Sequence, residues 1–335
     1  MDDAHGSPFN AAWQQSLRDA VSSPAELLSL LELDPGLPVL DFERLKDFPL
    51  RVPRGFVARM RKRDPRDPLF LQVWPAAAEA EETPGYRLDA VGDLTSLRGG
   101  GVIHKYRGRA LLIATGACAV HCRYCFRRHF PYTEALAARH HWREALDQLA
   151  ADPSIHEVIL SGGDPLSLSD DKLAAFASQL AGLPQIRRLR LHSRQPVVLP
   201  ERVDAALLRW LDALPIQKLM VLHINHPAEI DDGVRAAIAR LRAAGLTVLN
   251  QSVLLRGIND DPDTLAELSE KLFDGGVLPY YLHVLDQTLG TAHFDVDAMT
   301  AQTLLRCLNQ RLPGFLVPRL VREVAGAPGK VPVAW

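Results

Sequence analysis

The chain has 335 residues, of which 47% are apolar and 23% charged, and its formal net charge is −2. This length allows one large domain with an appendage or two domains, and the small net charge gives no support for a nucleic-acid or membrane partner. The chain has no run of about 18 apolar residues and no N-terminal signal pattern, so we expect a soluble cytoplasmic protein.

Residues 1–100 differ in pattern from the rest of the chain. Helical patterns over 11–20 and 25–33 are followed by frequent prolines that interrupt regular structure. We therefore expect a mostly helical, Pro-rich N-terminal extension over 1–100 that covers one side of a core over 101–315. Residues 316–335 form a short C-terminal segment in this division.

From residue 110 onward, apolar β-rich runs alternate with amphipathic helical patterns. The expected strands span 110–115, 157–161, 188–192, 219–224, 247–254 and 280–285. The expected helices lie near 134–150, 169–182, 201–213, 228–244, 262–274 and 298–311. Six such βα repeats predict an α/β fold with a parallel sheet and helices outside it. Periodicity alone leaves both an open doubly wound sheet and a barrel possible.

Three of the four cysteines, Cys118, Cys122 and Cys125, fall within eight positions at the spacing C-x3-C-x2-C, directly after the first strand. They cannot each find a disulfide partner, because only Cys307 remains. Thiolates at this spacing are typical ligands of one soft metal centre. A closed zinc site takes four ligands, whereas a four-iron cluster held by three thiolates keeps one iron open for another ligand.

The cysteine spacing, with Tyr124 as the aromatic residue before the last cysteine, resembles the cluster loop of radical S-adenosylmethionine (SAM) enzymes. The alternatives are a zinc knuckle and a purely structural cluster. The resemblance implies a partial (βα)6 TIM-like barrel in which SAM binds the open iron of a [4Fe-4S] cluster, with the chemistry at the C-terminal ends of the strands. By the same resemblance Gly162, Gly163 and Asp164, after the second strand, hold the amino group of SAM. By itself, Gly-Gly-Asp-Pro is an ordinary turn.

A narrower resemblance covers residues from about 40 to 333. The polar motifs that begin at His192, His223 and Asn250, with Pro279–Asp286 and Ala327-Pro-Gly-Lys330-Val-Pro332, are similar in order and spacing to those of lysine 2,3-aminomutase. This similarity implies that Lys330 holds pyridoxal phosphate (PLP) covalently, a task suited to a primary amine. It implies further cofactor contacts, with Lys105, Arg109 and Arg194 at the PLP phosphate and Gln251, less surely Asn250, at SAM.

The same resemblance implies how a lysine substrate is held. Arg127 corresponds to the arginine that binds the substrate carboxylate, although its neighbour Arg128 leaves a one-residue ambiguity. Asp286 corresponds to an aspartate that binds the distal ammonium group. The second such aspartate is replaced by Glu323, whose side chain is longer. The histidines near the strand ends are scattered, and we expect them to be structural or hydrogen-bonding residues.

The larger clostridial members of that family bind zinc through cysteines in a C-terminal extension and one further cysteine. Asp261 stands at the further position, and the chain stops at Trp335, so no zinc is expected. The short form resembles the bacterial enzyme that supplies β-lysine for elongation factor P, to which a separate ligase attaches it. L-lysine is then the substrate, and an electron donor such as flavodoxin or ferredoxin is expected. The alternatives are a radical SAM enzyme of another class, such as an activase or RNA-modifying enzyme, and a non-catalytic iron–sulfur protein.

Overall fold

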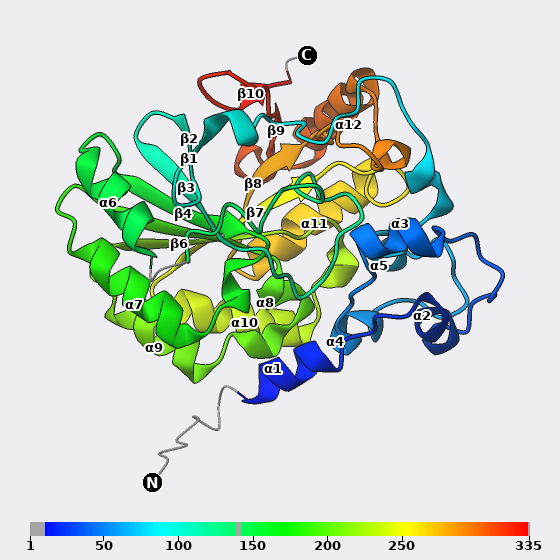
Figure 1. Ribbon diagram of the computed structural model, residues 1–335. Coiled ribbons are helices and arrows are strands. Elements are labelled where there is room, and N and C mark those ends of the chain that lie inside the picture. Colours follow the sequence, from blue (N-terminus) through cyan, green and yellow to red (C-terminus); the bar gives the residue numbers. More distant parts are fainter. Residues whose placement is uncertain (1–10, 139–141, 334–335) are drawn as a thin grey trace, which may run out of the picture.

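The structure is a computed structural model that describes residues 11–138 and 142–333. Its strands form one ten-stranded sheet in which they lie side by side in chain order (Figure 1). The strands are β1 (Leu97–Arg98), β2 (Val102–Tyr106), β3 (Arg109–Thr115), β4 (Glu157–Gly162), β5 (Arg188–Ser193), β6 (Gln217–Leu222), β7 (Thr247–Val253), β8 (Leu278–His283), β9 (Arg319–Arg322) and β10 (Val331–Pro332).

Strands β3 to β9 pair in parallel, whereas β1, β2 and β10 add antiparallel edges. All six predicted strands are present in the predicted order, and the predicted α/β class with a partial TIM-like barrel is confirmed. The seventh parallel strand, β9, was not predicted. It has four residues with the burial pattern exposed, buried, buried, exposed, which is too short for periodicity to identify.

Helices cover the outer face of the sheet, and a group of short helices from the N-terminal extension lies to one side (Figure 1). The extension contains α1 (Ala11–Arg18), α2 (Pro24–Leu30), α3 (Phe42–Asp47), α4 (Arg54–Val57) and α5 (Pro68–Leu71) with the 3-10 turns η1 (Ala77–Ala80) and η2 (Leu94–Ser96). The barrel helices are α6 (Arg143–Ala151), α7 (Asp170–Ala181), α8 (Gln195–Val198), α9 (Ala205–Ala213), α10 (Asp232–Ala243), α11 (Pro262–Asp274) and α12 (Ala298–Arg311). Further 3-10 turns are η4 (Pro165–Ser167), η5 (Pro200–Arg202), η6 (Pro227–Glu229), η7 (Ala292–Phe294) and η8 (Gly314–Leu316).

Local sequence explains where the helices begin. Six of the described α-helices start directly after an aspartate whose carboxylate accepts a backbone N–H of the first turn, namely Asp41, Asp67, Asp204, Asp231, Asp261 and Asp297. Asp261 is thus the N-cap of α11. The helix predicted over 134–150 begins only at Arg143, and residues 139–141 of that range lie outside the described residues.

Alternation along the strands assigns one set of side chains to the core and the other to the inside of the barrel. On β4, Val158 and Leu160 pack in the main hydrophobic cluster against the helices, whereas Ile159 and Ser161 line an internal cavity. On β5, Leu189 and Leu191 face the helices, and Arg190 and His192 line the same cavity. Apolar outward positions therefore leave the inward ones free for polar chemistry.

The N-terminal extension shares its core with the barrel. A second cluster joins apolar residues of the extension, including Phe56 and Phe70, to Ala119 and Val120 of the cysteine loop and to residues that follow β5. Burial of these side chains fixes the extension against the loop. The division into 1–100, 101–315 and 316–335 stays a prediction. In the described part of the chain, no helix has both the length and the apolar character needed to cross a bilayer.

Candidate active site

A cavity of about 630 Å³ lies inside the barrel. Its wall contains the residues that the sequence predicted for the site, from positions 105 to 330, with the exception of Asn250. They are Lys105, Arg109, Cys118, Cys122, Cys125, Arg127, Gly162, Gly163, Asp164, Arg194, Gln251, Asp286, Glu323 and Lys330. Asn250 Nδ2 instead donates to Ile224 O at 3.0 Å and to Ser252 Oγ at 2.9 Å. The structure therefore brings both sets of predicted cofactor residues to one cavity.

The cysteine loop leaves the end of β3 and turns back on itself, with Cys125 N donating to Cys122 O at 3.0 Å. All three thiols are free, and burial raises the pKa of Cys118 well above its usual value. Burial, followed by the charge of Cys122, raises the pKa of Cys125 to about 11. Among the described residues, no three Cys, His, Asp or Glu side chains are grouped closely enough to hold a single metal ion. Three free, partly buried thiols on one cavity wall fit a cationic iron–sulfur centre, which would stabilise them as thiolates.

The Gly162-Gly163-Asp164 turn lies directly against the start of the cysteine loop. Gly163 N donates to Thr115 O at 2.6 Å, and Asp164 N donates to Ala117 O at 2.8 Å. A Cβ on Gly163 would lie 2.5 Å from Ala117 O, and Gly162 has a φ of +116°. Both positions therefore require glycine.

The Asp164 carboxylate is already occupied by donors from the protein. It accepts hydrogen bonds from Ser193 Oγ at 2.8 Å, Arg194 N at 2.8 Å and Gln195 N at 3.0 Å. Leu166 N donates to it as well, at 3.0 Å. Asp164 thus ties the end of β4 to the segment after β5, and its contact with the SAM ammonium group stays a prediction.

Lys330 reaches the cavity on the chain segment that links β9 to β10, and its ammonium pairs with Glu323 at 2.8 Å. Glu323 also accepts a hydrogen bond from Tyr106 and lies 3.6 Å from Lys105 Nζ. Burial by itself raises the pKa of Glu323, but the charge and hydrogen bond of Lys330 and the hydrogen bond from Tyr106 outweigh it, so the pKa lies below its usual value. Arg109 stacks over the Tyr106 ring at 4.6 Å. Lys105 and Lys330 are thereby brought close to one carboxylate, and Arg109 contacts the tyrosine that donates to it.

Asp93, from the extension, binds two of the cations on the cavity wall. Its carboxylate accepts from Arg127 Nε at 2.6 Å and lies 2.6 Å from Lys105 Nζ. Arg127 Nη1 donates to Ser161 Oγ at 2.9 Å. Two sides of the guanidinium are thus fixed, and in the described part of the chain Nη2 has no hydrogen-bond acceptor. Sequence reasoning missed Asp93, because nothing near it in the chain indicates a partner 34 positions away.

Arg128, the alternative to Arg127, is tied into a separate buried cluster. It donates to Glu79 Oε2 at 2.5 Å and to Gly290 O at 3.2 Å. Glu79 also binds the fully buried Arg123 through both carboxylate oxygens, at 2.6 and 2.7 Å. This arrangement favours Arg127 over Arg128 as a group available to a ligand.

Asp286 follows β8 and is a buried carboxyl group on the cavity wall. Burial raises its pKa to about 7, and the charge of Lys330 acts in the opposite direction. No ion pair or side-chain hydrogen bond joins it to another described residue. A buried carboxylate without a partner is costly, so a cationic ligand group would stabilise it.

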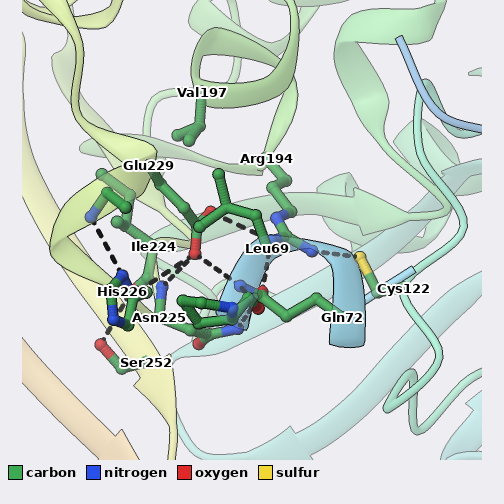
Figure 2. A network of polar contacts seen from close by, with 12 residues as sticks. Leu69, Gln72, Cys122, Arg194, Val197, Ile224, Asn225, His226, Glu229 and Ser252 are labelled. Carbon is green, nitrogen blue, oxygen red and sulfur yellow. Dashed lines mark hydrogen bonds and ion pairs between the residues drawn. The ribbon is translucent and has the colours of Figure 1, made fainter. Parts of the chain in front are cut away.

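The structure differs from the prediction for Arg194, which was assigned to the PLP phosphate. Arg194 Nη1 donates to Cys122 Sγ at 2.8 Å, and Nη2 donates to Glu229 Oε2 at 3.0 Å (Figure 2). Both terminal nitrogens are therefore engaged by protein groups, one on the cysteine loop and one on the turn η6.

Three histidines add uncharged polar groups to the cavity. Burial lowers the pKa of His223 to about 3, with help from the charges of Arg194 and Arg127. Burial also holds the pKa values of His192 and His283 well below the usual value. Gln251 Nε2 lies 3.2 Å from His223 Nε2. The imidazoles are neutral at physiological pH, so they act as hydrogen-bonding groups.

The fold and the cysteine loop define the class of protein. Residues 112–268 match the family described as the Radical SAM superfamily. Over nearly its whole length the chain is also similar to enzymes named L-lysine 2,3-aminomutase. The Escherichia coli protein is 47% identical over 97% of this chain and 95% of its own length. The Haemophilus influenzae protein is 45% identical over 95% and 94%, and the longer Clostridium subterminale protein is 31% identical over 96% and 77%. The chain belongs to the lysine 2,3-aminomutase family.

Proposed function

We propose that this protein is a radical SAM L-lysine 2,3-aminomutase, an isomerase that converts L-α-lysine to β-lysine. The observation that carries the proposal is the position of Lys330 and Asp286 on the wall of the same cavity as the three cysteines. This reaction needs three groups in one place, namely a radical-generating centre, an amine that can hold PLP and an acceptor for a distal ammonium group.

The cofactors supply the difficult chemistry. When bound, a reduced cluster with SAM would supply a radical able to remove hydrogen from the β-carbon, and PLP would supply the chemistry for moving the amino group from the α- to the β-carbon. Cys118, Cys122 and Cys125 would hold the cluster, and the Gly162–Gly163 turn, Asp164 and Gln251 would bind SAM. Lys330 would hold PLP, and the cations Lys105 and Arg109 would bind its phosphate.

The substrate is held at both ends by opposite charges. Arg127, fixed by Asp93 and Ser161, offers its free Nη2 to the carboxylate of lysine. Asp286, with Glu323 as the second acidic group, accepts the ε-ammonium. Burial of these groups excludes water from the radical chemistry. We further propose that the enzyme is cytoplasmic and receives electrons from a flavodoxin- or ferredoxin-like donor. Its product, β-lysine, would serve the modification of elongation factor P.

The test is anaerobic incubation of reconstituted enzyme with L-lysine, SAM, PLP and a reductant, followed by chromatographic separation of α- and β-lysine. We expect β-lysine from the wild type and from Lys172→Ala, an exposed lysine on α7. Lys330→Ala should form none and should lack the imine absorbance of PLP. Cleavage of SAM without β-lysine would overturn the substrate assignment, and failure to cleave SAM at all would favour a non-catalytic iron–sulfur protein.

A further inference from the structure

Arg194 connects a cysteine of the loop to a buried polar network. Its Nη1 donates to Cys122 Sγ at 2.8 Å, while its Nη2 donates to Gln72 Oε1 at 2.5 Å and to Glu229 Oε2 at 3.0 Å. Figure 2 shows the guanidinium lying between the sulfur on one side and these two oxygens on the other. Arg194 and its two oxygen acceptors come from three parts of the chain. Arg194 lies in the segment after β5, Gln72 at the end of α5 and Glu229 in the turn η6.

The groups that hold Arg194 are themselves fixed. Glu229 Oε1 accepts from Asn225 N at 2.9 Å and from Gln72 Nε2 at 3.1 Å. Asn225 Nδ2 donates to Gln72 Oε1 at 3.0 Å and to Tyr124 Oη at 2.6 Å. Gln72 and Glu229 are 0% exposed, and Arg194 is 4% exposed. The guanidinium therefore has one available orientation, and that orientation points at the sulfur.

The electrostatic consequence follows from the charge of the guanidinium, which does not lose its proton in proteins. A one-electron reduction adds negative charge to a cluster, so a fixed positive charge and a hydrogen bond at a ligand sulfur favour the reduced state. Hydrogen bonds to the sulfurs and solvent exposure are among the levers that set cluster potentials. The effect is strong here because the site is buried and poorly screened. Glu229 acts in the opposite direction but lies on the far side of the guanidinium.

We propose that Arg194 is a positioning residue for the iron–sulfur cluster, which orients Cys122 and raises the reduction potential of the cluster, and that Gln72 and Glu229 hold it in place. The inference rests on the proposed cluster at Cys118, Cys122 and Cys125. It gives the N-terminal extension a part in cluster chemistry, since Gln72 comes from the end of α5.

The experiment measures potential and not turnover. Anaerobically reconstituted wild type, Arg194→Met and Arg194→Lys are titrated with redox mediators, without SAM or lysine, and the reduced cluster is followed by electron paramagnetic resonance. For Arg194→Met we expect the equilibrium constant for reduction to fall about tenfold or more, which is about 59 mV for one electron. In Arg194→Lys the equilibrium constant for reduction should fall less, because lysine keeps the positive charge but loses the two-pronged geometry.

Two further variants separate this effect from general damage. Glu229→Gln keeps a side-chain oxygen that can accept from Arg194 Nη2 but removes the negative charge, so the cluster potential of this variant should rise. Arg202→Met removes another fully buried arginine, which is paired with Asp170 and makes no contact with a cysteine. Its cluster potential should equal that of the wild type.

The inference would be overturned if Arg194→Met had the wild-type cluster potential, or if the cluster potential were lower than wild type in both Arg194→Met and Glu229→Gln. Should Arg194→Met fail to hold a cluster, a lower potential in Arg194→Lys together with a higher one in Glu229→Gln still supports it, and any other order refutes it. A wild type that takes up no iron–sulfur cluster would instead overturn the proposed function, and this inference with it.

Discussion

Asp93 and Arg127 form a buried ion pair in which Arg127 Nε lies 2.6 Å from a carboxylate oxygen of Asp93. Asp93 comes from the N-terminal extension and Arg127 from the end of the cysteine loop, so the pair fixes a proposed substrate ligand from outside the barrel. The same carboxylate binds Lys105, which places one negative charge between two cations of the cavity.

Replacing Asp93 by Asn should weaken lysine binding. The amide keeps the shape but removes the charge that orients Arg127 and Lys105, so we expect the KM for lysine to rise about tenfold or more, which is about 1.4 kcal/mol. Steady-state kinetics on the reconstituted enzyme measure this change. Glu82→Gln is the matched control, because Glu82 is an exposed carboxylate of the same segment. Equal KM values for the two variants would contradict the role of Asp93.

Asp286 should give the enzyme a pH dependence near neutrality. Its pKa is raised to about 7 by burial, and only the deprotonated form attracts the ε-ammonium of lysine, which stays protonated well above this pH. We therefore expect kcat/KM for lysine to rise with pH between about 6 and about 8. Asp286→Asn should have a much lower kcat/KM and lack this rise. If the variant keeps the wild-type pH profile, another group titrates.

The raised pKa of Asp286 also has a defined effect on stability. Because the folded-state pKa lies above the unfolded value, the folded state binds more protons between about pH 4 and about pH 7. This group therefore contributes a loss of stability as pH rises through that range. Asp286→Asn should remove the contribution, so its free energy of unfolding, measured by urea denaturation of the apoprotein, should exceed that of the wild type more at pH 8 than at pH 5. An equal difference at both pH values would show that Asp286 does not titrate in this range.

Glu79 should be important for stability. It is 7% exposed as a residue and bridges the fully buried Arg123 and Arg128. Glu79→Gln leaves two buried guanidinium groups without a counter-ion, so we expect a loss of about 3 kcal/mol or more in the free energy of unfolding. Urea denaturation of the apoprotein measures it. Glu81→Gln, an exposed neighbour, should change the stability by less than about 0.5 kcal/mol. Comparable losses in the two variants would refute the bridging role.

Gly163 should tolerate no side chain. An added Cβ would lie 2.5 Å from Ala117 O and 2.8 Å from Gly116 C, both backbone atoms of the two residues that precede Cys118. Gly163→Ala must therefore displace either the turn or the cysteine loop, and we expect weaker SAM binding by equilibrium dialysis and lower iron content after reconstitution. At Gly314 an added Cβ meets nothing within 4 Å, so Gly314→Ala should bind both as the wild type does. Normal SAM binding and iron content in Gly163→Ala would show that the turn can move freely.

The sequence predicted the parts of the fold that local pattern controls. Runs such as Val158–Leu160 are buried on both faces of a parallel sheet, so composition alone identifies them as strands. The four-residue β9 has only two buried positions and leaves no periodic signal. The predicted starts at 262 and 298 coincide with those of α11 and α12, whereas α9 and α10 begin at Ala205 and Asp232, four residues later than predicted.

Contacts between distant segments could not be predicted in this way. The three cysteines are neighbours in sequence, and their spacing indicates a shared ligand. Gln72, Glu79 and Asp93 bind arginines that lie 34 to 122 positions further along the chain, and no local feature distinguishes them from surface residues. Arg194 was recognised as a candidate site residue, but its partner Cys122 depends on how β5 and the cysteine loop meet in space.

The extension has a consequence for attempts to dissect this protein. Glu79 and Asp93 are the buried anions for Arg123, Arg127 and Arg128, and none of the three arginines has an ion-pair partner among the described residues after position 100. A fragment that begins at residue 101 would retain all the cofactor ligands and yet contain several buried positive charges with nothing to balance them. The smallest autonomous enzyme is therefore larger than its catalytic barrel, and grafting the barrel into another protein requires new acidic residues at these positions.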